Sequence, residues 1–210
     1  MSFRLVVLRH GSTRWNRERR YQGCVDVRLS AEGQAQAETA KRFLADRRFA
    51  AVYASPLARA QETAGAIAGP PRLPVLAAPA FREICLGIWE GLDIPEVKAR
   101  FPELYATWLA APSAAVIPEA ESLADVQKRV FEGLQELRAA HEGESVCLVA
   151  HGVTIRLLIL DALGLPPERL WSISVKPTAI SEIEYTDGWT TLRRMNVVPH
   201  LDEAEAGTVP

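Results

Sequence analysis

The sequence is short of cysteine, and it lacks a long apolar run. Its three cysteines stand at positions 24, 85 and 147 without any Cys-x-x-Cys pair, so the spacing predicts neither a zinc knuckle nor a disulfide framework. The apolar run over residues 3–8 is interrupted by Arg4 and is too short for a signal peptide. No stretch reaches the length of a membrane span. We therefore expect a soluble, cytoplasmic protein that has no membrane partner.

Excess basic charge is also missing. The 210 residues contain 24 Lys plus Arg against 26 Asp plus Glu, a formal net charge of −2, which gives no support for nucleic-acid binding. The composition, 48% hydrophobic and 24% charged, is that of a folded protein with a large core, and the length favours one domain over residues 1–210. Only four of the basic residues are lysines. Because arginine binds phosphate and carboxylate through two parallel hydrogen bonds, this bias favours an anionic ligand.

Predicted strands and helices alternate along the chain. Apolar runs predict strands over 3–8, 51–54, 75–78 and 145–150, and alternation predicts a hairpin of 180–185 with 190–195. Cap residues and helical spacing predict helices over 30–47, from 55 onward, over 122–141 and over 154–163. We expect a loop over 12–29 and a frayed tail after Pro199. The alternation predicts an α/β fold, a three-layer α/β/α sandwich with a mainly parallel sheet.

Four prolines divide residues 81–121 into short helical pieces, of which 103–109 is the clearest. We expect a small helical insert, over about residues 92–121, that covers the active site and is not a second domain. The insert carries four large apolar residues at helical spacing, which are Phe101, Leu104, Tyr105 and Trp108. They either pack against the sheet or form an apolar lid over the ligand, and the sequence leaves both interpretations open.

Two of the four histidines follow apolar strands in similar surroundings. His10 ends the sequence Val-Val-Leu-Arg-His-Gly, and His151 ends Leu-Val-Ala-His-Gly. One such histidine is ordinarily a strand-end residue with a satisfied hydrogen bond. Two in the same context, one of them beside Arg9, indicate a shared site, because ligands bind at the carboxyl ends of the strands in such folds.

A third motif, at residues 53–60, adds an arginine to this site. Ser55 is predicted to cap the helix that follows, with Arg59 in its first turn. Alone, this is typical of a capped helix with a surface arginine. Beside Arg9 and the two histidines, it predicts the wall of an anion site, because a helix N-terminus and a guanidinium both attract negative charge. Glu83 and Glu90 lie in a glycine-containing loop, and spacing does not decide which of them could act as a general acid.

Taken together, these motifs resemble the histidine phosphatase superfamily, the phosphoglycerate-mutase-like fold. The matching segments occur in order between residues 3 and 165, and their combination is far more specific than any one of them. They are Leu8–Asn16, Gln22-Gly23 with Asp26, Leu29–Ala37, Ser55–Ala64, Glu83–Gly91, Glu121-Ser122 and Val149–Gly152. Two positions depart from the usual pattern: Ser12 stands where relatives often have an acid or amide, and Ala120 where they have glycine.

The resemblance implies a role for each matching residue. His10 would be the nucleophile that becomes phosphohistidine, and Glu83, rather than Glu90, would be the general acid. Three cationic or polar groups would surround the phosphoryl group: Arg9, Arg59 and a protonated His151. Further substrate contacts would come from Asn16, Gln22 and Gly152. We also expect the second ring nitrogen of His10 to donate to a backbone carbonyl, which fixes the tautomer.

The implied activity is that of a metal-independent phosphomonoesterase. It would hydrolyse small phosphorylated metabolites with broad specificity and without a cofactor, since arginines and a histidine can stabilise the transition-state charge. The alternatives are a cofactor-dependent phosphoglycerate mutase, a narrower enzyme such as an α-ribazole phosphatase, and a non-catalytic binder of a phosphorylated ligand. A metal site on His10 and His151 would lack a third ligand at recognisable spacing, and Arg9 would repel the cation. The oligomeric state is left open.

Overall fold

A six-stranded sheet forms the centre of the protein in a computed structural model that describes residues 2–68 and 73–198. The strand order is β3-β2-β4-β1-β5-β6. Four neighbouring strands run parallel: β3 (Val75–Ala77), β2 (Ala51–Ala54), β4 (Ser145–Ala150) and β1 (Phe3–Arg9). The hairpin of β5 (Ile180–Tyr185) and β6 (Thr190–Val197) completes the sheet in antiparallel pairing. The predicted mainly parallel sheet is confirmed.

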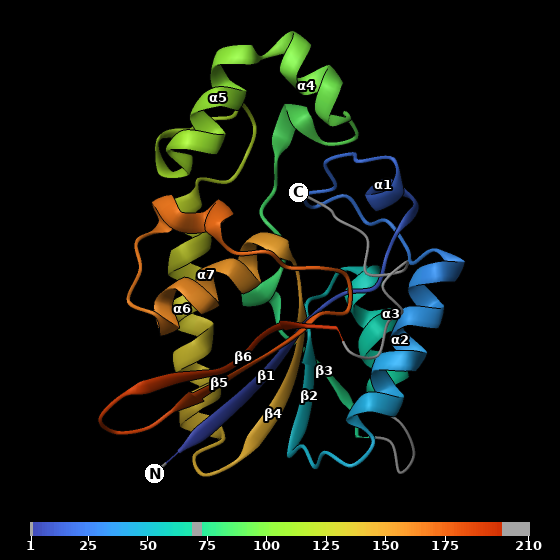
Figure 1. The fold of residues 1–210 in the computed structure, drawn as a ribbon, viewed down its shortest axis with the longest axis vertical. Coiled ribbons are helices and arrows are strands. Elements are labelled where there is room, and N and C mark those ends of the chain that lie inside the picture. Colours follow the sequence, from blue (N-terminus) through green and yellow to red (C-terminus); the bar gives the residue numbers. More distant parts are fainter. Residues whose placement is uncertain (1, 69–72, 199–210) are drawn as a thin grey trace.

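Helices cover both faces of the sheet (Figure 1). The side chains of β1 alternate between two buried clusters, as the period of a strand requires: Leu5 and Val7 belong to one, Val6 and Leu8 to the other. The first cluster also contains residues of α6 (Leu123–Ala140) and α7 (Gly152–Ala162). The second contains residues of α2 (Ala31–Leu44) and α3 (Ala58–Ala68). This is the predicted α/β/α sandwich, with an apolar core on each face.

Two local predictions are wrong. The segment 12–29 is not wholly a loop, because it contains α1 (Arg14–Arg17), which begins in a capping box between Thr13 and Asn16. Ser55 does not cap α3, which begins only at Ala58. Instead the carboxylate of Asp26 accepts the backbone N–H of Ala58 at 2.6 Å. A residue 32 positions away thus accepts the first N–H of the helix, whereas the Ser55 hydroxyl accepts the N–H of Leu57, before the helix begins, at 3.3 Å.

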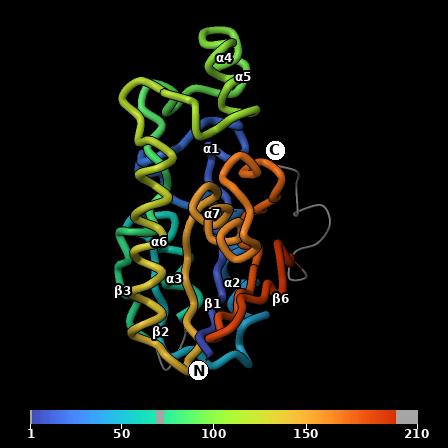
Figure 2. Tube along the Cα trace, turned by 90° about the vertical axis from the view of Figure 1, so that its left-hand side faces the viewer, coloured from blue at the N-terminus to red at the C-terminus, as the bar shows by residue number. Residues whose placement is uncertain are grey.

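The insert lies beyond the carboxyl ends of the parallel strands (Figures 1 and 2). It contains α4 (Ile94–Arg100), α5 (Pro102–Ala110) and a 3-10 turn at Pro112–Ala114. The indole of Trp171, in the 3-10 helix Pro167–Ser172, donates to the carbonyl oxygen of Trp108 at 2.8 Å and joins α5 to the body of the fold. In the described part of the chain, no helix is both long and apolar enough to cross a membrane. The predicted tail after Pro199 lies outside the described residues.

Candidate active site

His10 and His151 lie side by side at the ends of neighbouring parallel strands. The pairing of β1 with β4 places Arg9 opposite Ala150, so both histidines leave the sheet at the same level. Their ring centroids are 5.1 Å apart, and both side chains are buried. The expected convergence of these two motifs is therefore present.

The His10 ring is oriented by the backbone. Its Nδ1 donates to the carbonyl oxygen of Gly11 at 2.7 Å, as expected, so Nε2 is the unprotonated nitrogen. Gly11 is needed for a close approach of two backbones, because a Cβ at this position would lie 2.4 Å from the Gly33 carbonyl oxygen. Burial, and then the charges of Arg59 and Arg9, hold the pKa of His10 well below its ordinary value. The ring is a neutral imidazole whose Nε2 can act as a nucleophile.

Burial also disfavours a proton on His151 in the free protein, and the protonated imidazole expected around a bound phosphoryl group stays a prediction. Its Nε2 forms a hydrogen bond with the Ser55 hydroxyl at 2.7 Å. Among the described residues, its buried Nδ1 has no partner. Burial, and to a smaller extent the charge of Arg59, hold the pKa of His151 well below its ordinary value. A bound phosphate dianion would reverse this electrostatic balance, since it would favour a proton on the ring.

Two arginines of the site are held by backbone carbonyls. Arg59 donates through Nη2 to Gly23 and through Nη1 to Val25, both at 2.8 Å. Arg9 donates through Nη1 to Val175 at 2.7 Å. Burial lowers the pKa of Arg59 to about 10, so its guanidinium stays charged at neutral pH. Neither arginine has a carboxylate within ion-pair distance in the described part of the chain, and both charges remain for a ligand.

The two candidate acids, Glu83 and Glu90, lie in different surroundings. Glu83 lines the cavity, and its carboxylate accepts the N–H of Ile84 at 3.1 Å and of Val153 at 3.2 Å, at the start of α7. Glu90 is not among the residues that line the cavity; its Oε1 accepts the N–H of Cys24 at 2.8 Å and of Leu86 at 2.9 Å. Glu90 therefore connects two loops, and Glu83 is the carboxylate that a ligand can reach.

A cavity of about 190 Å³ joins these groups to the insert. Its polar lining also contains Asn16, Gln22 and Gly152, whereas His151, which is fully buried, is the predicted site residue that does not line it. An apolar wall faces them, formed by Tyr21, Ile94, Tyr105, Trp108, Leu109 and Trp171. The sequence left open whether the large apolar residues of the insert pack in the core or face the ligand, and the structure differs between them. Tyr105 and Trp108 both line the cavity and pack in the larger buried cluster, whereas Phe101 and Leu104 pack against that cluster without lining the cavity.

Arg156 is a lining residue that sequence reasoning missed. It lies on α7 one turn after Gly152, is 7% exposed, and donates through Nε to the Ile173 carbonyl at 2.8 Å. Its guanidinium carbon lies 5.0 Å from the ring centroid of Trp171. The signal available in the sequence was the spacing of four residues from Gly152, which places both on one face of the helix.

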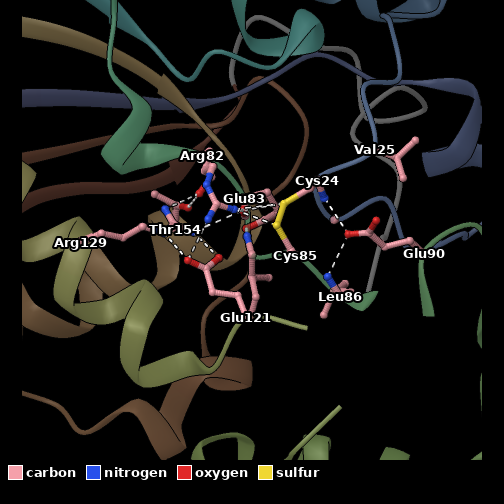
Figure 3. Close-up of a disulfide and its surroundings, with 12 residues drawn as sticks. Cys24, Val25, Arg82, Glu83, Cys85, Leu86, Glu90, Glu121, Arg129 and Thr154 are labelled. Atoms are coloured by element: carbon pink, nitrogen blue, oxygen red, sulfur yellow. Dashed lines mark hydrogen bonds and ion pairs between the residues drawn. A yellow bond between two sulfur atoms is a disulfide. The ribbon is translucent and has the colours of Figure 1, made fainter. Parts of the chain in front are cut away.

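A disulfide joins Cys24 to Cys85 (Figure 3), a pairing that the spacing of the cysteines did not predict. The two residues are 61 positions apart, but their Cα atoms lie 4.7 Å from each other. The Arg82 Nη1 lies 3.0 and 2.8 Å from the two sulfurs. The two cysteines and Glu90 form a cluster with the spacing of a metal site. The S–S bond uses both thiolates, and the arginine disfavours a cation there.

Comparison with known proteins agrees with this geometry. The sequence profile of the histidine phosphatase superfamily, branch 1, matches residues 5–198. Phosphoserine phosphatase 1 of Hydrogenobacter thermophilus is 32% identical over 200 residues, which cover 95% of each chain. The structure of YhfR from Bacillus stearothermophilus superposes with a TM-score of 0.89 at 33% identity, covering 94% of this chain and 98% of the other. A phosphoserine phosphatase mutant of Entamoeba histolytica, solved with phosphoserine, superposes with a TM-score of 0.85 at 28% identity, over 95% and 99%.

The site and these matches define the chain as a phosphohydrolase. It belongs to the histidine phosphatase superfamily, and its fold and its phosphatase class are those that the sequence motifs implied.

Proposed function

We propose that the protein hydrolyses small phosphomonoesters through a phosphohistidine on Nε2 of His10, without a metal ion. The observation that carries the proposal is the state of His10. Its Nδ1 is bound to the Gly11 carbonyl, its pKa is lowered by burial, and it lines the cavity together with Arg9 and Arg59. A neutral, oriented imidazole between two cations is suited to attack a phosphorus atom whose oxygens those cations hold.

The reaction would proceed in two displacements. In the first, Nε2 of His10 forms a bond to phosphorus while the bond to the ester oxygen breaks, and Glu83 gives its proton to that oxygen. In the second, water attacks the phosphohistidine, Glu83 takes a proton from the water, and inorganic phosphate leaves. Arg9 and Arg59 would stabilise the charge on the equatorial oxygens in both steps. His151, neutral in the free protein, would hydrogen bond to the bound phosphoryl group.

The cavity supports a small substrate with an apolar or aromatic part. Its wall of two tyrosines and two tryptophans would favour such leaving groups through contact area rather than through specific hydrogen bonds. Broad specificity is the expectation for such a wall. The named activities of two relatives, both phosphoserine phosphatases, place small phosphorylated metabolites first in a substrate panel. α-Ribazole 5′-phosphate belongs in the same panel as the test of a narrower enzyme.

The deciding experiment traps the intermediate. Brief reaction with ³²P-labelled substrate, followed by denaturation, should leave label on the protein that is lost in acid and kept in base. His10→Ala should carry no label. His141→Ala is the matched control, because His141 binds Tyr53 and Glu144 away from the cavity, and it should keep the label. Label that survives acid, or that persists in His10→Ala, contradicts the proposal.

Two further measurements separate the alternatives. Turnover that is unchanged by EDTA supports the metal-independent reaction, and turnover abolished by EDTA contradicts it. A non-catalytic binder would bind phosphate esters with no release of phosphate from any member of the panel.

A further inference from the structure

One arginine outside the cavity holds the backbone that carries the candidate general acid. Arg129 of α6 makes five hydrogen bonds, as many as its guanidinium has N–H groups. Three of them go to backbone carbonyl oxygens, of Ala80 at 2.7 Å, Arg82 at 2.8 Å and Glu83 at 3.3 Å. These carbonyls belong to four consecutive residues that end at Glu83, so the guanidinium fixes the course of the chain up to the acid.

The other two N–H groups of Arg129 bind a carboxylate. Its Nε and Nη2 donate to the two oxygens of Glu121 at 2.8 and 2.9 Å, and Glu121 also accepts from Nη2 of Arg82 at 3.0 Å (Figure 3). The side chains of Arg129 and Glu121 are 17% and 12% exposed. A bidentate pair has one planar geometry, so Glu121 orients the guanidinium that binds the carbonyls.

Two helices pack against this segment of backbone. Gly133 lies one turn after Arg129 on the same face of α6, and a Cβ there would be 2.6 Å from the Cβ of Ala80. The absence of a side chain at Gly133 lets the segment approach α6 closely enough for Arg129 to reach three carbonyls. From α7, the hydroxyl of Thr154 donates to the carbonyl oxygen of Arg82 at 2.9 Å. The segment is therefore held by α6 and α7 together.

The direction of the Glu83 side chain depends on this backbone. Its carboxylate accepts hydrogen bonds from the backbone N–H groups of Ile84 and Val153, and Ile84 is its own neighbour in the chain. A shift of the backbone at Glu83 would therefore move the carboxylate and one of its donors together. Among the described residues, those that line the cavity do not include Arg129. Its influence on a ligand would have to pass through Glu83.

We propose that Arg129, oriented by Glu121, is a positioning residue for the general acid. It would fix the backbone at Glu83 so that the carboxyl group meets the oxygen of the leaving group. The proposal rests on the proposed function for the role of Glu83. Displacement of an acid from the ester oxygen slows proton transfer and leaves the phosphoryl site intact. Arg129 should therefore matter for leaving groups that need a proton, and little for those that leave without one.

The test compares kcat/KM for two aromatic esters, benzyl phosphate and p-nitrophenyl phosphate. This constant reports the steps up to the phosphoenzyme. Benzyl alcohol takes a proton as it leaves, whereas p-nitrophenolate does not. Arg129→Gln should lower the value for benzyl phosphate about tenfold or more and that for p-nitrophenyl phosphate no more than about twofold, since a misplaced acid affects only the first. The ratio of the two values does not depend on the amount of folded enzyme, so it can be measured on a destabilised variant.

Three measurements separate positioning from a general loss of structure. Arg129→Lys keeps the charge but has too few donors for three carbonyls and a carboxylate, so its ratio should be intermediate. Lys128→Gln is the matched control, because this neighbour on α6 is exposed and carries the same charge, and it should keep the ratio of the wild type. Inhibition by inorganic phosphate should be unchanged in Arg129→Gln, because Arg129 does not line the cavity.

A double-mutant cycle gives the deciding result. In Glu83→Gln, adding Arg129→Gln should change the ratio by less than about twofold, because no acid is left to position. A change as large as in the wild type would overturn the proposal. Equal losses for both esters, or weaker inhibition by phosphate in Arg129→Gln, would also overturn it. If Glu83→Gln alone leaves the ratio unchanged, the proposed role of Glu83 is wrong. If Glu83→Gln shifts the ratio and Arg129→Gln does not, only the positioning role is wrong.

Discussion

The disulfide between Cys24 and Cys85 connects the segment that holds Arg59 to the segment that carries Glu83 (Figure 3). The carbonyls that bind the Arg59 guanidinium belong to the residues immediately before and after Cys24. Glu83 lies two residues before Cys85. Glu90 links the same two segments through hydrogen bonds to the N–H groups of Cys24 and Leu86. One covalent and one non-covalent link thus set the distance between an anion-binding group and the candidate acid.

Reduction of this disulfide should lower both stability and turnover. The bond closes a loop of about 60 residues. Its loss should therefore lower the free energy of unfolding by about 2–4 kcal/mol, chiefly by freeing the unfolded chain. Turnover should fall together with stability, because Arg59 and Glu83 lose a common support. Thermal unfolding and phosphatase assays with and without dithiothreitol measure both effects.

The control for reduction is the double variant Cys24→Ser with Cys85→Ser. It should be less stable than the wild type, and dithiothreitol should change neither its melting temperature nor its rate. If the reductant affects the double variant as strongly as the wild type, the effect does not come from this bond.

Glu83→Gln should impair the protonation of the leaving group. Turnover of alkyl phosphates should fall about 10²-fold or more, the usual scale for loss of a general acid. Formation of the phosphoenzyme from p-nitrophenyl phosphate should fall less, because p-nitrophenolate leaves without a proton. Glu90→Gln keeps an oxygen that can accept the same two N–H groups, and it is the matched control. A larger loss in Glu90→Gln than in Glu83→Gln, or equal losses for both esters, would reverse the assignment.

Stability should decrease in mild acid because of the two buried histidines. Their folded-state pKa values lie well below the ordinary value, whereas in the unfolded chain they titrate near 6.5. Below that pH the unfolded state binds more protons, so the free energy of unfolding falls as pH falls, by up to about 1.4 kcal/mol per pH unit for each histidine. Urea unfolding at pH 7.5, 6.5 and 5.5 measures the slope. His10→Gln and His151→Gln should each reduce it, and the double variant should reduce it further; an unchanged slope in the double variant would show that these groups are not its source.

Hydrolysis should exceed mutase activity. A mutase must exclude water and hold a bisphosphate while it turns. Here Ile84 and Leu86 give the cavity apolar walls, and the bases of the insert, Lys98 and Arg100, are not among the residues that line it. The arginines that do line it beyond the proposed phosphoryl site are Arg19, Arg20 and Arg156, and the assay tests whether they hold a second phosphate. With 3-phosphoglycerate and 2,3-bisphosphoglycerate present, phosphate release should exceed formation of 2-phosphoglycerate. Isomerisation many-fold faster than phosphate release would identify a mutase.

Much of the fold could be predicted, because its signals are local. The β1 run, the Ser30 cap of α2 and the spacing of apolar residues in α6 each depend on residues within a few positions of one another. The predictions failed where a distant residue intervened. Ser55 is the example: the sequence Ser-Pro is typical of a helix start, but Asp26 caps α3 instead, and the Ser55 hydroxyl binds His151.

The candidate site also has features that the sequence predicts and features that depend on the tertiary structure. The sequence by itself determined the α/β class, the two strand-end histidines and the residues that match the superfamily motifs, since these depend on residue type and order. Only the tertiary structure decided which of Glu83 and Glu90 faces the cavity, that Cys24 meets Cys85, and that Arg156 is buried there. It also decided that burial holds the pKa of His151 below its ordinary value. Each of these features depends on which distant segments the strand order brings together and on how completely packing excludes water from a charged group. A local pattern of residues contains neither kind of information.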